Sequence, residues 1–136
     1  MKRKTWLVLS LFSVICMAKV IELPIGLKGV KVPPATRTIL ANIDGRTIYT
    51  FDQDVAGEST CFDRCLVIWP AVFIDENQNV EELPKDFGVH TRTDNGKLQL
   101  TFKDSPLYLF ISDSKEGDIK GDGLGGVWHL IELKEE

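Results

Sequence analysis

The chain has 136 residues and a formal net charge of −4, with 20 acidic side chains against 16 basic ones. This length suits one domain with a single hydrophobic core. The acidic balance argues against nucleic acid as a partner, because a phosphate backbone is bound by a surplus of Lys and Arg.

Residues 1–18 have the three parts of a secretory signal peptide: a basic start, an apolar run from Trp6 to Ile15, and a short exit that ends at Ala18. The run is shorter than the roughly 20 apolar residues that span a bilayer, and we expect no transmembrane segment in the mature chain. Cleavage after Ala18 removes three of the 16 basic residues and none of the 20 acidic ones, which leaves a formal charge of −7. The expected location is the periplasm or the exterior.

Cys16 offers an alternative to simple cleavage, because Ser13-Val14-Ile15-Cys16 partly matches the site at which lipoproteins are cut and lipidated. The peptidase for that site prefers a small residue before the cysteine, and Ile15 is β-branched. We therefore favour cleavage over a lipid anchor.

After the signal, residues 19–37 mix short apolar pieces with prolines and glycines, which predicts an extended N-terminal arm. The domain itself is expected over residues 38–136. It opens with a hairpin, because strand-like segments at 38–43 and 46–51 flank Asp44-Gly45, a dipeptide suited to a tight turn.

One short helical turn is predicted at residues 60–63, with Thr60 and Asp63 as candidate caps. Next to it, Cys61 and Cys65 are the two cysteines left after cleavage, and such a pair in an oxidising compartment most simply forms a disulfide. Closing so small a loop contributes about 2 kcal/mol.

The second part of the chain begins with an acidic segment at residues 75–86, which is expected to be an exposed loop. A second hairpin is predicted where residues 89–93 meet residues 97–103. The segment 107–111 is apolar on both faces and is expected in the middle of a sheet, and residues 127–133 are again strand-like. The pattern predicts a mainly β fold of two similar halves, packed as a small sandwich or barrel, with the helical turn near the cysteines.

Four residues recur with the same spacing in both halves: Tyr49, Phe51, Asp54 and Trp69 in the first, and Tyr108, Phe110, Asp113 and Trp128 in the second. The second set follows the first by 59 residues. Such a match indicates an internal duplication, with half-repeats at about residues 38–73 and 97–133.

The repeated residues have a structural interpretation. A Tyr and a Phe two positions apart share one face of a strand and bury a large aromatic area, and the Asp then falls where the strand ends. There it can accept bonds from the following turn or from a tyrosine hydroxyl. We therefore place the six aromatic residues in the core. The functional alternative is a pair formed by Asp54 and Asp113.

These motifs, with the cysteine pair before Trp69-Pro70, the segment 106–110 and the glycine-rich residues 117–129, resemble the bacterial secreted-repeat family, often described as lipoproteins with a Tyr-x-(Phe/Trp/Tyr)-x-x-Asp motif. The resemblance covers about residues 38–133. It implies an extracytoplasmic setting and a repeat that occurs singly or in tandem. It implies no chemistry, because the family has no agreed activity.

A second hypothesis is metal binding, in which soft ligands hold copper or zinc for an electron-transfer role. The candidate ligands are Cys61, Cys65, His90 and His129. Their spacing matches no metal motif, and we expect His129 to be packed and hydrogen-bonded on the face of Val127, Ile131 and Leu133. His90 fits a surface position equally well.

Calcium is a further candidate, with Asp113, Asp118 and Asp122 as ligands. The loop is not an EF-hand, because Lys120 and His129 occupy places where that motif has ligands. Thiol exchange at the two cysteines is a third alternative, although the spacing is Cys-x-x-x-Cys and not Cys-x-x-Cys.

The leading functional hypothesis is a non-enzymatic periplasmic or secreted module that binds an unknown envelope component and needs no cofactor. It rests on the lack of a nucleophile elbow or phosphate loop and on a duplicated scaffold whose marked residues have packing roles. The alternative is a metal-binding, electron-transfer or thiol-redox accessory protein.

Overall fold

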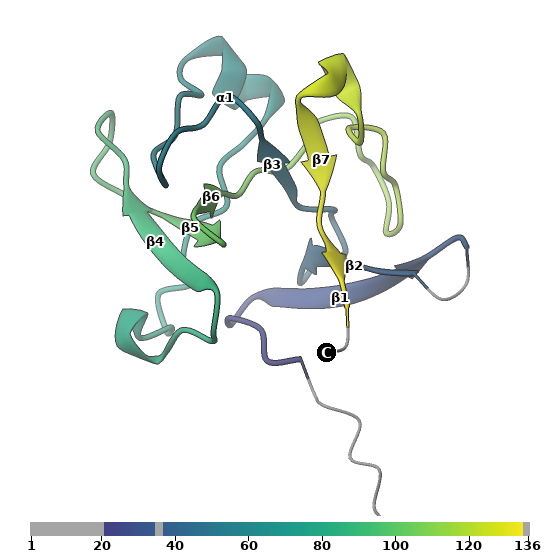
Figure 1. The fold of residues 1–136 in the computed structure, drawn as a ribbon, viewed down its shortest axis with the longest axis horizontal. Helices are drawn as coiled ribbons and strands as arrows, with labels where there is room; N and C mark the ends of the chain where they lie inside the picture. Colours follow the sequence, from purple (N-terminus) through teal and green to yellow (C-terminus); the bar gives the residue numbers. More distant parts are fainter. Residues whose placement is uncertain (1–20, 35–36, 135–136) are drawn as a thin grey trace, which may run out of the picture.

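The computed structural model describes residues 21–34 and 37–134 and shows a mainly β fold, as predicted (Figure 1). The strands form three small sheets: β1 (Leu27–Val32), β2 (Arg37–Asn42) and β8 (Glu132–Leu133); β3 (Tyr49–Phe51) and β7 (Trp128–Leu130); and β4 (Phe87–Thr91), β5 (Leu98–Phe102) and β6 (Ser105–Pro106). Within these described ranges, helical structure is confined to α1 (Arg64–Ile68) and two short 3₁₀ turns, η1 (Val80–Glu82) and η2 (Leu124–Gly126). The strands described do not close into a barrel.

The predicted signal peptide and Cys16 lie outside the described residues. Across the ranges that the structure does describe, every helix is too short to cross a bilayer.

The predicted N-terminal arm is not separate from the domain. It contains β1, which pairs with β2 along its whole length, from Leu27 opposite Asn42 to Val32 opposite Arg37. Val30 and Val32 point into a small core with residues of β2. Gly26 and Pro33 lie just outside this strand, and Gly29 lies within it, where a Cβ would come 2.9 Å from Thr38 Cγ2.

Both predicted hairpin turns are present, and in each a glycine adopts a positive φ, 83° at Gly45 and 71° at Gly96. The second hairpin joins β4 to β5. In the first, the returning segment bonds to β2 only as far as Ile48, whose N–H donates to the Leu40 carbonyl at 3.0 Å. From Tyr49 the chain leaves β2 and pairs with β7, so the predicted strand at 46–51 is split.

The predicted helical turn is displaced along the chain, because α1 begins at Arg64, beyond residues 60–63. Thr60 does not cap it. Its N–H and hydroxyl both donate to Asp54, at 2.7 and 2.9 Å, which fixes Thr60 to the preceding turn. Asp63 occupies the cap position with φ of 52° and makes no side-chain cap bond.

The predicted strand at 127–133 is also broken, at Ile131, between β7 and β8, which belong to different sheets. The segment 107–111 lies between two neighbours, since Tyr108 pairs with both Tyr49 and Ala71. Leu107 and Tyr108 are fully buried as expected, but Ile111 is 61 % exposed and does not share that burial.

The end of each repeat pairs with the other repeat. Val72 belongs to the end of the first repeat and Ile74 directly follows it, yet Val72 N–H donates to the Leu107 carbonyl at 2.9 Å and Ile74 N–H to that of Leu98 at 3.0 Å. In the same way β7 lies beside β3 and β8 pairs with β2 (Figure 1). The repeats are therefore interlocked, and each completes the sheets of the other.

The main hydrophobic core follows the same pseudo-symmetry. Its fully buried members are Leu40, Ile48, Val72, Leu100, Leu107 and Ile131. Ile48 and Leu107 are 59 residues apart, as are Val72 and Ile131. The duplication thus fixes the core as well as the aromatic motif.

Candidate functional site

A stack of four aromatic rings lies where the two repeats meet. Its ring centroids are 4.1 Å apart from Phe51 to Trp128, 3.7 Å from Trp128 to Trp69, and 4.3 Å from Trp69 to Phe110. Each neighbouring pair takes one ring from each repeat. Stacked aromatic pairs contribute about 0.5–1.5 kcal/mol beyond their buried area, so the stack holds the repeats together.

The two tyrosines meet this stack edge-on. Tyr49 lies at 82° to Trp69 and Tyr108 at 88° to Trp128, the T-shaped arrangement that the ring quadrupoles favour. Gly121 approaches closely, since a Cβ there would lie 2.8 Å from Trp69 Cη2 and 2.9 Å from Tyr49 Cζ. The rings therefore leave space for glycine alone at this position.

Each motif tyrosine donates its hydroxyl proton to the motif aspartate of the other repeat. Tyr49 Oη donates to Asp113 Oδ2 and Tyr108 Oη to Asp54 Oδ2, both at 2.7 Å. The remaining oxygen of each carboxylate accepts a backbone N–H from the turn that follows it. The expected bond between carboxylate and tyrosine thus exists and crosses between repeats. Each aspartate is engaged by a different tyrosine, which does not support a catalytic pair of Asp54 and Asp113.

Burial dominates the acid–base properties of these groups. It raises the pKa of Tyr49 far above its ordinary value, and the hydrogen bond to Asp113 raises it further. Burial likewise raises the pKa of Tyr108, while a bond with Ser59 opposes the rise. Burial also raises the pKa of Asp113, against the lowering effect of its bonds with Tyr49 and Lys120.

The raised tyrosine pKa values predict a specific alkaline behaviour. The chain has 2 tyrosines, and both lie in this site. Above pH about 10 the unfolded chain loses its tyrosine protons while the folded chain keeps them, so stability present below that pH is lost as pH rises further. In an alkaline titration we expect tyrosinate absorbance to appear only together with loss of circular dichroism. Tyrosinate forming near pH 10 in a still-folded domain would contradict the buried, paired state.

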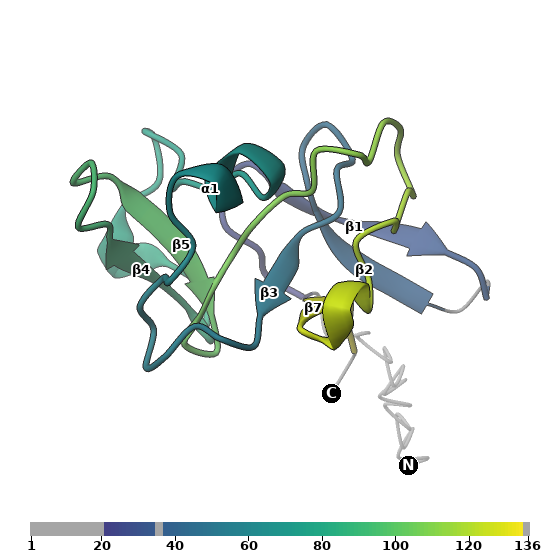
Figure 2. The same cartoon turned by 90° about the horizontal axis from the view of Figure 1, so that it is seen from above.

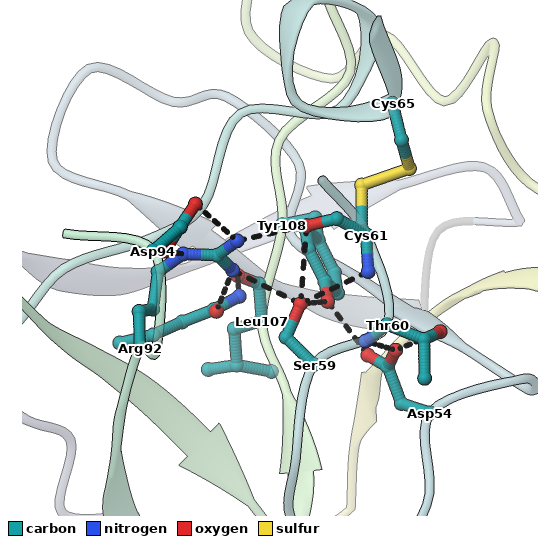
Figure 3. The surroundings of a disulfide bond; sticks show 10 residues. Asp54, Ser59, Thr60, Cys61, Cys65, Arg92, Asp94, Leu107 and Tyr108 are labelled. Carbon is teal, nitrogen blue, oxygen red and sulfur yellow. Dashed lines mark hydrogen bonds and ion pairs between the residues drawn. A yellow bond between two sulfur atoms is a disulfide. The ribbon is translucent and has the colours of Figure 1, made fainter. Parts of the chain in front are cut away.

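The predicted disulfide between Cys61 and Cys65 is present, with Cα atoms 5.3 Å apart. The backbone carbonyl of Cys61 accepts a hydrogen bond from the buried guanidinium of Arg92 (Figure 3). The five N–H groups of Arg92 are all engaged, with Asp94 Oδ1 and Oδ2, Ser59 Oγ, Gln99 Oε1 and the carbonyl of Cys61. A buried charge persists only when it is paired and hydrogen-bonded in this way. The same contact lowers the pKa of Asp94.

Arg92 also connects the disulfide loop to the repeated motif. It donates to Ser59 Oγ at 2.9 Å, Ser59 Oγ lies 2.5 Å from Tyr108 Oη, and that hydroxyl donates to Asp54 (Figure 3). Sequence reasoning missed Arg92, because an arginine at the end of a hairpin arm ordinarily faces solvent. The sequence feature that could have indicated a paired arginine is Asp94, which lies two residues further on in the turn and binds Arg92.

The structure separates the predicted metal ligands. Cys61 and Cys65 are bonded to each other, and His90 lies on β4. His129 Nε2 is 2.7 Å from Asp52 Oδ2, with both side chains about half exposed. His129 is thus hydrogen-bonded as expected but not packed with Ile131 and Leu133, because the strand breaks at Ile131. Within residues 21–34 and 37–134, no three His, Cys, Asp or Glu side chains gather in a way that could hold a metal ion.

The carboxylates proposed for calcium serve the loop itself. Asp118 Oδ2 accepts bonds from the N–H and hydroxyl of Ser114 and from the N–H of Lys115. These bonds lower the pKa of Asp118. Asp122 Oδ1 accepts the N–H of Leu130, and Asp113 accepts from Tyr49. They act as turn-forming acceptors.

Three exposed aliphatic residues lie on two neighbouring backbone segments on the outside of the domain. Val67 and Ile68 of α1 are 65 % and 46 % exposed, and Ile111 is 61 % exposed. Ile111 N–H donates to the Ile68 carbonyl at 2.9 Å, which places the two segments side by side. We call these three residues the α1 patch. Figure 1 shows α1 at the edge of the fold, and in Figure 2, seen from above, α1 lies on the side that faces the viewer.

The pseudo-symmetric counterpart of this patch is different. The positions 59 residues away are Gly126, Val127 and Asp52, and Asp52 N–H donates to the Val127 carbonyl at 2.8 Å, just as Ile111 does to Ile68. The same backbone hydrogen bond thus lies beside the Asp52–His129 pair at one junction of the repeats and beside exposed aliphatic residues at the other, although the counterpart of α1 is the turn η2, in which Gly125 and Gly126 have positive φ. The fold therefore does not require an apolar surface at this place.

A family model described as a secreted repeat of unknown function matches residues 36–73 and 89–132. The two matched ranges correspond to the two interlocked repeats. No curated protein and no solved structure matches the chain.

Proposed function

The chain belongs to the family of secreted repeats of unknown function, and from this we propose that it acts in the periplasm or as a secreted protein, as a non-enzymatic module that binds another envelope protein through the α1 patch. The duplicated motif is a scaffold in this proposal. The function resides where the two repeats differ.

The engagement of the motif residues supports a non-enzymatic role. Tyr49, Tyr108 and Asp113 are each at most 1 % exposed, and across the repeats Tyr49 bonds to Asp113 and Tyr108 to Asp54. A general acid or base must reach the proton it transfers in a bound substrate. These groups instead face each other inside the protein.

The α1 patch is the observation that carries the proposal. Exposed aliphatic residues that adjoin one another are typical of interaction surfaces when the fold does not explain them. Here the first repeat supplies an internal comparison for Ile111, because Asp52 occupies the equivalent position and makes the equivalent backbone hydrogen bond. Evolution of one copy towards an apolar surface is consistent with a contact made there.

Charge narrows the choice of partner to a protein with an apolar strip and a basic rim. The formal charge of the chain is −4, or −7 without the predicted signal, so it is repelled by anionic lipid headgroups and attracted to basic protein surfaces. Attraction of this kind weakens as salt is added.

The test is a binding assay with the purified domain on a support and an envelope extract of the source organism. We expect one component to be retained by the wild type, and its affinity to fall by at least about tenfold in Ile111→Asp and in Val67→Asp. Ile111→Asp should fold normally, because its equivalent position already holds Asp52. The matched control is Val55→Asp, at a position that is 66 % exposed and outside the patch.

Two outcomes would oppose the proposal. One is equal retention of every component by the wild type and the patch variants. The other is turnover of a substrate by the purified domain that is lost on changing Asp54 or Asp113.

A further inference from the structure

We propose that the Cys61–Cys65 disulfide is a redox switch for the α1 patch: reduction by a protein dithiol releases α1 from the domain, and reoxidation restores it. The effect on docking depends on the function proposed above for the patch. The release of α1 does not.

Besides the disulfide, α1 is held by Leu66, which packs against the aromatic cluster, and by the Ile68 carbonyl, which accepts from Ile111 N–H. The helix has five residues, none of them fully buried, and no side-chain cap at its start. A helix of this length is not stable alone in water. The residue before it, Asp63, adopts a φ of 52°, which a non-glycine residue rarely does without support from the surrounding structure. The bridge from Cys65 to buried Cys61 supplies that support.

The two sulfur atoms are not equally accessible. Cys61 is fully buried, whereas Cys65 is partly exposed on α1. A thiolate of the dithiol therefore attacks Cys65 Sγ, and the S–S bond breaks with its electron pair on Cys61 Sγ, which takes up a proton. The second thiol of the reductant then displaces Cys65, which leaves as a thiol. The cysteines gain two electrons and two protons, and the dithiol ends as a disulfide.

The Cys61 side of the loop stays in place after reduction. Cys61 N–H donates to Ser59 Oγ at 3.2 Å, and the Cys61 carbonyl accepts from Arg92 Nη2 at 2.8 Å. Ser59 is in turn linked to the Tyr108–Asp54 bond. The core is therefore anchored independently of the disulfide, while Val67 and Ile68 lose the element that presents them. Reduction is expected to remove the patch without unfolding the domain.

The test is amide hydrogen exchange on the full-length chain, oxidised and after treatment with a small dithiol. We expect the amides of Leu66 and Trp69, which bond within α1, to exchange at least about tenfold faster after reduction. The amides of Tyr49 and Tyr108, which bond to each other's carbonyls, should keep their protection. The double variant Cys61→Ser, Cys65→Ser should reproduce the reduced pattern and show no further response to the dithiol.

Three results would overturn the switch: unchanged protection of α1 in the reduced protein, loss of protection at Tyr49 and Tyr108 as well, or resistance of the bond to the dithiol under native conditions. Binding separates this proposal from the previous one. If Ile111→Asp abolishes retention but reduced and oxidised protein are retained equally, the switch fails and the docking function stands. If Ile111→Asp is retained normally, the docking function fails, and the exchange result still decides whether α1 is released.

Discussion

Replacing Trp69 or Trp128 with alanine is expected to lower the free energy of unfolding by about 3–5 kcal/mol. Both side chains are 6 % exposed at the centre of the four-ring stack, and each lies between two rings of the other repeat. Because of the pseudo-symmetry, the two substitutions should have similar effects. Urea denaturation followed by circular dichroism measures both values.

The matched control is Phe73→Ala, whose ring is 41 % exposed and lies outside the stack. It should change stability by at most about 1 kcal/mol. In every variant the two repeats should unfold in one transition, because each repeat is completed by the other. Two separate transitions, one for each repeat, would contradict the interlocked arrangement.

Asp113→Ala is expected to destabilise the domain by about 3 kcal/mol, because it leaves the buried hydroxyl of Tyr49 and the N–H of Lys120 without their acceptor. The equivalent change, Asp54→Ala, removes the same kinds of bond from a half-exposed site. Water can replace the lost acceptor there, so we expect about 1–2 kcal/mol.

Equal stability losses in Asp113→Ala and Asp54→Ala would contradict the expectation that the more buried aspartate contributes more to stability. The control is Asp52→Ala, in an exposed pair with His129, which should change stability by at most about 1 kcal/mol because exposed ion pairs contribute little. All three variants can be compared at neutral pH in the same denaturation series.

The duplication, the aromatic core, the disulfide and both hairpin turns could be predicted from the sequence, because each depends on residue spacing or on a turn glycine. The bonding of each tyrosine to the aspartate of the other repeat could not be predicted. Tyr49 is spaced identically from the aspartate of its own repeat as Tyr108 is from its own, and nothing in a linear pattern says that each tyrosine reaches the other aspartate. That choice is made by the tertiary pairing of β3 with β7.

Other differences have equally local causes. Gly26 and Pro33 directly flank β1, and because such residues are typical of turns and loops, the sequence predicted an extended arm instead of a strand. Thr60 is drawn to Asp54 and not to the helix it was expected to cap. Arg92 can be buried because four neighbouring residues accept hydrogen bonds from it. These acceptors are brought together only by folding.

The surface of the module was the part least accessible from sequence. Ile111 continues an apolar run and was expected to be buried, and His129 was expected among aliphatic neighbours. Only the pseudo-symmetry shows that Ile111 and Asp52, the partner of His129, occupy equivalent positions and that the two copies differ there. The α1 patch thus contains an exposed aliphatic side chain, Ile111, where the equivalent position of the first repeat holds Asp52.

Double-mutant cycles on the two tyrosines and two aspartates test the central claim most directly. Tyr49→Phe with Asp113→Ala, and Tyr108→Phe with Asp54→Ala, should each show a coupling of about 1–2 kcal/mol in the free energy of unfolding. Tyr49→Phe with Asp54→Ala should be additive within about 0.5 kcal/mol. Coupling between the tyrosine and aspartate of the same repeat, with additivity across repeats, would contradict the hydrogen bonding of each tyrosine to the aspartate of the other repeat.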